Sequence, residues 1–577
     1  MAAAIRSTGQ IPLPSIRNTC SSTRHCWPSM SMNGCYGGST ATDKSAVGVC
    51  ETRTLASVSE SEHAVPQLKL AVAALEAQPP ESTSGIIRLQ VPIRQRRDAL
   101  EWLQAQHQAS SSPCCFFSSR TLNQTSTILP LVTSKGVVRL LKDDDDVNQA
   151  LVSIAGVGSA VFFRGFDSFA LHDWQSIRRF LSEDCPFIRA YGAMRFEGRT
   201  IIAPEWKGFG SFFFIVPQVE FNELQESSML ALTIAWDNNL LWTWQSAINE
   251  LKDTLGQISP CLGRLRKLDT KSVVLNFQHF PSKGSWDISV KRALEIINGT
   301  EEELVKVVLA RCSKYITDTT TDPLVLLASL KVESQNCFQF YLQPPDSPAF
   351  IGNTPEQLFH RKCLHVTSEA LAGTRARGIT KKEDLQIGQE LLCSPKDNIE
   401  FVIVRESIRG KLEVICDDVI IQPCKALRKL PRVQHLSAQL SGRLRDKFCE
   451  FDILSSLHPS PAVCGLPMED AQRFINENET FDRGMYAGPV GWFGGRESEF
   501  AVGIRSALVV NGVGMLVYAG AGIVEGTNPS SEWEELDLKE SQVQTCAPPS
   551  IFCHFLVWIC YSFSFPLPLS VHKVASV

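Results

Sequence analysis

The chain has 577 residues, of which 44% are hydrophobic and 20% are charged, and its formal net charge is −5. A slightly acidic chain has no broad basic field, so we exclude nucleic acid as its partner. The length is sufficient for one very large domain or for about two to four domains of ordinary size.

The N-terminal segment has the composition of an organellar address. Residues 1–50 contain four lysine or arginine residues, many serines and threonines, and a single acidic residue, Asp43. They lack the continuous apolar segment of a secretory signal, and this pattern is typical of a transit peptide. We assign residues 1–60 to a transit peptide and expect cleavage between about 45 and 80.

The other end of the chain, residues 543–577, has an atypical composition rich in Phe, Ser, Cys and Pro. Ile551 to Ser570 is about long enough to span a bilayer. Pro566, Pro568 and the interleaved serines argue against a spanning helix, so we expect no membrane association. We interpret the tail as a frame or splice difference in the gene, translated in place of a proper last helix.

The nineteen cysteines are scattered through the chain and include no CxxC pair. This distribution favours buried thiols over a disulfide framework or a metal site.

Residues 80–284 alternate short β-like runs with helices and contain no compact set of nucleophile, base and orienting residue. Their many aromatic side chains, Phe212–Phe214 among them, are expected in the core. The expected strands are Ile86–Val91, Ser126–Val132, Ser159–Arg164, Gly210–Val216, Met229–Asp237 and Val273–Phe280. The expected helices are Arg96–Gln108, Asp173–Glu183 and Leu240–Ile258.

A lysine lies within an apolar β run after the expected helix Ser285–Ile297. Leu304–Arg311 alternates so that Lys306 shares one face with Val308 and Ala310. Burying an ammonium group without a partner costs several kcal/mol. Lys306 is therefore either a residue that protects a sheet edge or a functional amine.

Two later strand ends carry residues suited to a site. Asn353–Glu356 closes a strand with a turn, and Glu356 there is either a helix-start acid or a catalytic one. Glu369–Thr374 ends a strand in small residues, as if the backbone approached a ligand. Residues 380–408 are expected to form a charged helix that carries Glu400.

The stretch Ala519–Lys539 combines a small-residue turn with an acidic helix. A Ser-x-x-Glu capping-box pattern at Ser531 predicts the helix start. Glu532, Glu535 and Lys539 are three and four residues apart, so they share one face. Such a face either holds a divalent cation together with an anionic substrate or is an ordinary acidic helix start with a surface pair.

In this order the motifs resemble the chorismate-utilising enzymes, which include isochorismate, anthranilate, aminodeoxychorismate and salicylate synthases. The resemblance covers residues 285–541 densely, through KVVLAR, TPE, ALAGT, HLSA, LHPSPAVCG, FDRGMYAGPVGW and YAGAGIVEGTNPSSEWEE. More loosely, the N-terminal half resembles the plant isochorismate synthases, which are plastid enzymes. The resemblance implies one large α+β domain of two stacked antiparallel sheets flanked by helices, in a monomer of the chloroplast stroma.

For the isochorismate branch, the resemblance implies that water adds at C2 of chorismate while the C4 hydroxyl leaves. Lys306 matches the family's general base and Glu356 its general acid, and burial favours the neutral forms that both roles need. Glu400 and Glu535 match ligands of Mg²⁺, with Glu532 bound through water or close by. The positions that match the family's substrate-binding surfaces are Gly373, His435, Ala462, Arg505, Gly520, Gly522 and Lys539.

Two positions favour the water-using branch. Ammonia-using members lack a lysine at the position of Lys306, and anthranilate synthases usually carry Thr at the position of Ala462. The alternatives are a salicylate synthase, which goes on to eliminate pyruvate, and a non-catalytic isoform that lacks its final helix. The product would feed either phylloquinone or salicylic acid biosynthesis.

Overall fold

The computed structural model describes residues 30–31, 45–106, 112–120, 131–133, 136–138, 151–197, 201–259, 274–299, 304–318, 321–333, 336–446, 448–510 and 514–544. The tail after residue 544 and most of the predicted transit peptide lie outside these residues. So does most of the strand expected at Ser126–Val132.

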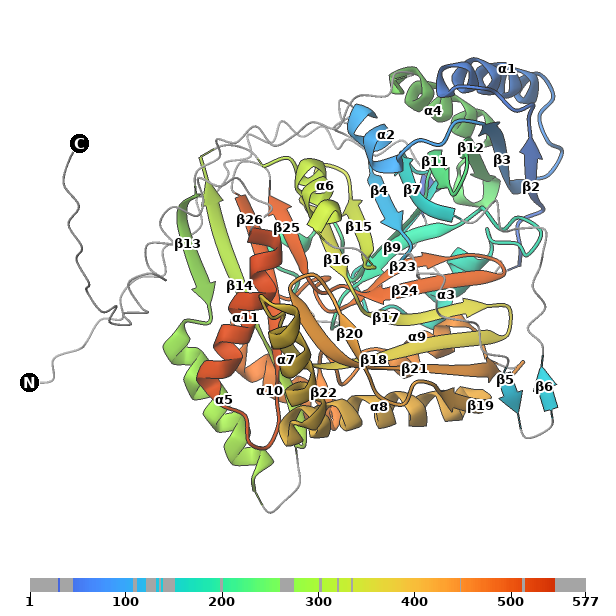
Figure 1. The fold of residues 1–577 in the computed structure, drawn as a ribbon. Coiled ribbons are helices and arrows are strands. Elements are labelled where there is room, and N and C mark those ends of the chain that lie inside the picture. The colour runs from blue at the N-terminus through green and yellow to red at the C-terminus, as the bar shows by residue number, and fades with distance from the viewer. Residues whose placement is uncertain are drawn as a thin grey trace, which may run out of the picture.

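Two large sheets make up the fold, and their strands run in different directions (Figure 1). The eleven-stranded sheet has the order β1 (Met30–Ser31), β8 (Val161–Gly165), β10 (Phe212–Val216), β9 (Ala190–Met194), β23 (Pro489–Phe493), β24 (Glu497–Val502), β17 (Gln357–Lys362), β18 (His365–Ala376), β21 (Val433–Leu444) and β19 (Cys416–Ile421), with β20 (Ala426–Lys429) on β21. The thirteen-stranded sheet has the order β13 (Val274–Phe280), β14 (Lys306–Thr317), β26 (Gly514–Ile523), β25 (Ser506–Val510), β16 (Ala349–Thr354), β15 (Phe338–Gln343), β4 (Cys114–Ser118), β7 (Leu151–Val157), β11 (Val219–Leu224), β12 (Ser228–Asp237), β3 (Ser84–Ile93) and β2 (Val49–Thr54), with β22 (Gly465–Leu466) on β14. A separate pair is formed by β5 (Leu131–Thr133) and β6 (Gly136–Val138).

The ladders among the described strands are antiparallel except β1–β8 and β2–β3. Helices flank the sheets: α1 (Ala64–Ala77), α2 (Ala99–Gln106), α3 (Leu171–Arg178), α4 (Trp244–Gln257), α5 (Lys283–Ile297), α6 (Pro323–Glu333), α7 (Lys381–Cys393), α8 (Pro395–Ile415), α9 (Glu450–Leu457), α10 (Met468–Asn478) and α11 (Pro529–Gln544). The predicted class, two stacked sheets flanked by helices, is confirmed.

Aromatic side chains fill the space between the two sheets, as the sequence predicts. Phe117 of β4 stacks on Tyr191 of β9, with ring centroids 5.6 Å apart. This contact connects the thirteen-stranded sheet to the eleven-stranded sheet. Phe213 and Phe214 of β10 are buried in the same core. A second core lies between the thirteen-stranded sheet and helices α1, α2, α4 and α6. Burial of these large rings supplies much of the hydrophobic stabilisation.

Many element ends differ from the expected ones by a few residues, as where α3 ends at Arg178 rather than Glu183. Three further differences change how the chain is organised. Strand β2 at Val49–Thr54 pairs with β3, so ordered structure begins inside the range 1–60 that was assigned to the transit peptide. The single helix expected at 380–408 is two helices, because Pro395 has no N–H to continue α7 and instead takes the first position of α8.

The third difference concerns the last helix, α11. The capping box predicted at Ser531 is wrong, because the helix begins at Pro529 and Asn528 caps it. The Asn528 Oδ1 atom accepts hydrogen bonds from the N–H groups of Ser530 at 2.9 Å and Ser531 at 3.2 Å.

The helix expected to begin at Ser531 is present as α11, whereas the helix expected to be missing after residue 543 falls almost wholly outside the described residues. Helix α11 runs to Gln544 and packs on β26 and α5 (Figure 1). Its Trp533 lies 6.0 Å from Trp286 of α5, and its Leu536 is fully buried. The sheet beside it is therefore covered. In the described part of the chain, no helix is long and apolar enough to cross a membrane.

A buried ion pair fixes α11 to the sheet. Arg311 of β14 contacts Glu540 at 2.8 Å, with both side chains fully buried, and it contacts Asp537 at 2.7 Å. Ser313 donates a further hydrogen bond of 2.7 Å to Glu540. Removing one partner of such a pair leaves an uncompensated buried charge.

We expect Glu540→Ala to lower the free energy of unfolding by about 3–5 kcal/mol, measured by urea denaturation, because Arg311 then lacks its buried partner. The matched control is Glu477→Ala, which breaks the exposed 2.9 Å pair with Arg292. That change is expected to lower the free energy of unfolding by at most about 1 kcal/mol. Equal losses in the two variants would contradict the assignment of α11's anchor.

Candidate active site

One cavity lies where β14, β18, β21, β26, α8 and α11 meet, and its lining residues fall between positions 308 and 539. All of them belong to the region 285–541 that the motifs single out. The predicted site residues in its lining are Glu356, Gly373, Glu400, His435, Ala462, Arg505, Gly520, Gly522, Glu535 and Lys539. Lys306 and Glu532 lie behind this lining, each in contact with another charged residue.

Lys306 is fully buried, and its Nζ atom lies 3.0 Å from Oε1 of Glu400 on α8. The reading of Lys306 as a residue that protects a sheet edge is therefore wrong, since β14 has neighbours on both sides. Gly522 makes room for this pair. A Cβ atom there would lie 2.2 Å from the Glu400 carboxylate and 3.1 Å from the Lys306 side chain, so a larger residue would displace the Glu400 carboxylate from this pair.

Glu356 lies in the turn between β16 and β17, where the chain passes from one sheet to the other. Burial raises its pKa to about 7, and the negative charge of Glu369 acts in the same direction. The positive charge of Lys306 lowers the pKa but does not outweigh burial. A carboxyl group with this pKa is a proton donor near neutral pH.

His435 of β21 is a neutral ring within the cavity wall. Burial, followed by the charge of Arg505, lowers its pKa to about 3. Its Nδ1 atom lies 3.1 Å from the carbonyl oxygen of Gly373, while Nε2 lies 3.5 Å from Nη2 of Arg505. Because Arg505 has only donors, the proton resides on Nδ1 and is donated to Gly373. Gly373 sits at a bulge in β18 with φ of +66°, a conformation that favours glycine.

The cavity has two cationic groups placed to hold an anion. Arg505 has φ of +51° and is buried, and its Nη1 atom has no hydrogen-bond partner among the residues that the structure describes. A buried guanidinium donor without a partner suits an incoming carboxylate. Lys539 donates a hydrogen bond of 2.7 Å to the carbonyl oxygen of Gly520 and lies 2.6 Å from Glu535.

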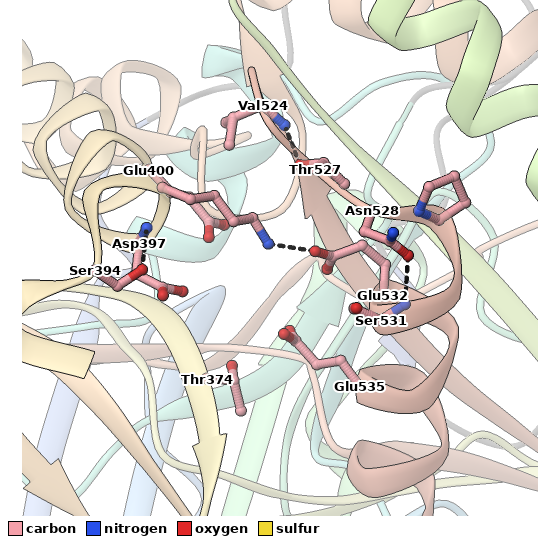
Figure 2. Close-up of polar contacts among 12 residues, drawn as sticks. Thr374, Ser394, Asp397, Glu400, Val524, Thr527, Asn528, Ser531, Glu532 and Glu535 are labelled. Carbon is pink, nitrogen blue, oxygen red and sulfur yellow. Dashed lines mark hydrogen bonds and ion pairs between the residues drawn. The ribbon is translucent and has the colours of Figure 1, made fainter. Parts of the chain in front are cut away.

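Three carboxylates from two helices turn toward one space: Glu400 of α8, and Glu532 and Glu535 of α11 (Figure 2). Each also contacts a lysine. Glu400 pairs with Lys306, Glu535 pairs with Lys539, and Glu532 pairs with Lys396.

The three carboxylates repel one another. Burial, together with the charges of Glu535 and Glu400, raises the pKa of Glu532 to about 7, although the charge and hydrogen bond of Lys396 act in the opposite direction. Within the described ranges, no three acidic, histidine or cysteine side chains are gathered as a ready-made metal cage. The residues nevertheless fit a hard divalent cation, since they supply oxygen ligands only and a cation would offset their repulsion.

Sequence reasoning missed several residues around the cavity. Tyr486 lies within the FDRGMYAGPVGW motif, and its hydroxyl oxygen would be 2.8 Å from a Cβ atom at Gly520. Lys396 stands four residues before Glu400 on α8, a spacing that places both on one helix face and so was a usable signal. Thr374 follows Gly373 directly and lines the cavity.

Comparison with known proteins gives a consistent result. The family described as chorismate binding enzyme matches residues 148–546. The chain is 53% identical over 525 residues to the "Isochorismate synthase, chloroplastic" of Catharanthus roseus, and the match covers 90% of each chain. It is also 53% identical over 513 residues to "Isochorismate synthase 2, chloroplastic" of Arabidopsis thaliana, and that match covers 89% of each chain.

The fold also matches a solved structure, that of MenF, the menaquinone-specific isochorismate synthase from Escherichia coli. The TM-score is 0.67 at 26% sequence identity, and the match covers 83% of this chain and 99% of that one. With a family match across most of its length and relatives more than half identical to it, the chain belongs to the chorismate binding enzyme family.

Proposed function

We propose that the chain is an isochorismate synthase, which adds water at C2 of chorismate and releases the C4 hydroxyl while the ring double bonds shift. One observation carries the proposal: the fully buried Lys306 lies behind the wall of a cavity whose lining includes Glu356, a carboxyl group with a pKa of about 7, together with cations placed to bind an anion. The relatives that are 53% identical carry this activity in their names.

The two proton transfers are assigned to Lys306 and Glu356. Lys306 is proposed to take the proton from the attacking water in its neutral amine form, becoming an ammonium group that Glu400 partners, and Glu356 is proposed to give its proton to the departing hydroxyl. Glu356 is suited to this step because burial keeps it protonated up to about pH 7. Positioned proton transfers of this kind are typically worth about 10²–10⁴ in rate.

Cations and backbone groups of the cavity are proposed to hold the two carboxylates of chorismate. Arg505 offers a buried N–H donor, and Lys539 offers an ammonium group on the face of α11. His435 is neutral and has its proton engaged by Gly373, so it is proposed to orient Arg505 through Nε2. Gly520 and Ala462, small residues of the lining, are proposed to leave room beside the ring of the substrate.

Mg²⁺ is proposed as the cofactor, held by Glu400 and Glu535, with Glu532 nearby. When bound, the ion would neutralise the substrate's ring carboxylate. Mg²⁺ keeps several waters and takes few protein carboxylates, which agrees with two or three glutamates at one end of the cavity. Glu532 and Lys396 are proposed to shape the field around these ligands.

The proposed location is the chloroplast stroma. The relatives in Catharanthus roseus and Arabidopsis thaliana are named chloroplastic, and residues 1–50 have a basic, acid-poor composition. Because β2 begins at Val49 and Val47 is buried, we place the cleavage of the transit peptide before Val47. The mature chain is proposed to act as a monomer.

We expect chorismate incubated with Mg²⁺ and the purified chain to give isochorismate, resolved by product chromatography. Lys306→Met and Glu356→Gln are each expected to lower kcat by about 10²–10⁴. Lys331→Met, at a partly exposed lysine that pairs with Asp98, is the control and should retain kcat. Formation of salicylate and pyruvate instead would identify a salicylate synthase, and no turnover would contradict the proposal.

The activity should fall as the pH rises through about 7, because the general acid Glu356 works in its protonated form and its pKa is about 7. The measurement is kcat/KM between about pH 5.5 and 9. In Glu356→Gln this descending limb should be absent from the residual activity. A limb that persists unchanged in the variant would assign it to another group.

Glu535→Gln should raise the Mg²⁺ concentration needed for half-maximal activity, because one carboxylate ligand is lost. Calorimetric titration of Mg²⁺ gives a second readout that does not depend on turnover. The matched control is Glu525→Gln, in the exposed loop before the same helix, which should bind Mg²⁺ like the parent. Equal binding by Glu535→Gln and the parent would exclude Glu535 as a ligand.

A further inference from the structure

Two arginines from distant parts of the chain hold one buried carboxylate beside the turn of Glu356. The carboxylate of Glu369 on β18 accepts hydrogen bonds from Nη1 and Nη2 of Arg120 at 2.8 and 2.6 Å. It also accepts from Nη1 and Nη2 of Arg428 at 2.8 and 2.7 Å. Two forked contacts on one carboxylate fix all three side chains in place.

The same arginines hold the backbone that presents Glu356. The carbonyl oxygen of Pro355 accepts from Nη1 of Arg120 at 3.2 Å and from Nη1 of Arg428 at 3.3 Å. The backbone N–H of Glu356 donates to Thr354 Oγ1 at 3.3 Å. The carbonyl oxygen of Pro355 and the N–H of Glu356 belong to the one peptide unit that precedes Glu356, so this unit is held at both of its polar atoms. The unit that follows is held by the N–H of Val502, which donates to the carbonyl oxygen of Glu356 at 3.0 Å, and the ring of Pro355 fixes φ at the residue before Glu356.

The cluster of Arg120, Glu369 and Arg428 lies where the chain passes from the thirteen-stranded sheet to the eleven-stranded sheet. Arg120 follows β4 of the thirteen-stranded sheet and stands 5.2 Å from the ring centroid of Phe338. Arg428 belongs to β20 of the eleven-stranded sheet. Neither arginine is among the residues that line the cavity, and both nitrogens of each fork are engaged by Glu369, so neither arginine is placed to bind the substrate.

The charges of the cluster act on Glu356. Burial alone would raise the pKa of Glu369, but the hydrogen bonds from Arg428 and Arg120 lower it to about 2, so this carboxylate stays ionised. The charged groups that face Glu356 are Lys306, Glu369, Lys539, Arg428 and Arg505. Among the cluster's members, Glu369 raises the pKa of Glu356 and Arg428 lowers it.

We propose that Arg120, Glu369 and Arg428 are positioning residues that fix the Thr354–Glu356 turn and aim the Glu356 carboxyl group at the reacting ring. This inference rests on the proposed role of Glu356 as the general acid. The two arginines act through the backbone of Pro355, and Glu369 holds both arginines in register. No member of the cluster transfers a proton.

The test compares Arg120→Met, Arg428→Met and Glu369→Gln in the full chain with chorismate and Mg²⁺. We expect kcat to fall by about 10²-fold, because a misplaced catalytic group loses rate on this scale. KM for chorismate should stay within about twofold of the parental value, since the cluster positions Glu356 and does not bind the substrate. The descending pH limb should move to higher pH in Arg428→Met and to lower pH in Glu369→Gln, in opposite directions because opposite charges are removed.

Two further variants separate positioning from general stability. Arg428→Lys keeps the charge but loses the fork, so its kcat should lie between those of the parent and Arg428→Met. Arg361→Met on β17 breaks a comparably buried pair with Glu450 of α9, and the carbonyl oxygen of Pro355 keeps its bonds from Arg120 and Arg428 in that variant. That control should lose stability while keeping the pH limb of the parent. Arg428→Lys and Glu369→Gln, which preserve size, carry the test if a methionine variant does not fold.

The outcomes distinguish the two proposals. A parent chain that leaves chorismate unchanged overturns the proposed function itself, and a Glu356→Gln variant with the parental kcat overturns the role of Glu356. If both of those results are as expected, an unmoved pH limb in Arg428→Met and Glu369→Gln overturns the positioning inference alone. The positioning inference is also overturned if the variants of Arg120, Arg428 and Glu369 lose no more kcat than Arg361→Met does.

Discussion

Pairing of buried charges is the constraint on which this structure depends. Three lysine–glutamate pairs lie around one cavity, and the pair between Lys306 and Glu400 includes a fully buried amine. A buried ion without a partner is costly, so strand β14 and helices α8 and α11 have to meet at this place. The aromatic core between the sheets, joined by contacts such as Phe117 with Tyr191, holds the framework that brings them together.

Surroundings rather than residue type decide what each acid does. Glu356 lies in the turn before β17 and Glu369 lies on β18, and both are buried. The pKa of the first is raised to about 7, whereas that of the second is lowered to about 2 because two guanidinium groups bond to it. One fold thus keeps a protonated acid and a permanent anion side by side, each with a different use.

Local patterns in the sequence predict the parts of the site that are contiguous. Alternation places Lys306 on a strand, and helical spacing places Glu535 and Lys539 on one face, where they form an i, i+4 pair. The contacts of Arg120 with Glu369 join residues 249 positions apart, and no local pattern encodes such a pairing. Boundaries failed where one residue outweighs a pattern, as Pro395 does in ending α7 and Asn528 does in capping α11.

The register of β14 and β26 has a consequence for the making of the protein. Val308 pairs with Gly522, so strands more than two hundred positions apart form one wall of the cavity, and α11 closes it. Synthesis proceeds from the N-terminus, and contacts of such sequence separation form slowly. No N-terminal fragment that stops before Lys539 contains a complete cavity, so the cavity is completed only after α11 has been synthesised and has folded onto the sheet.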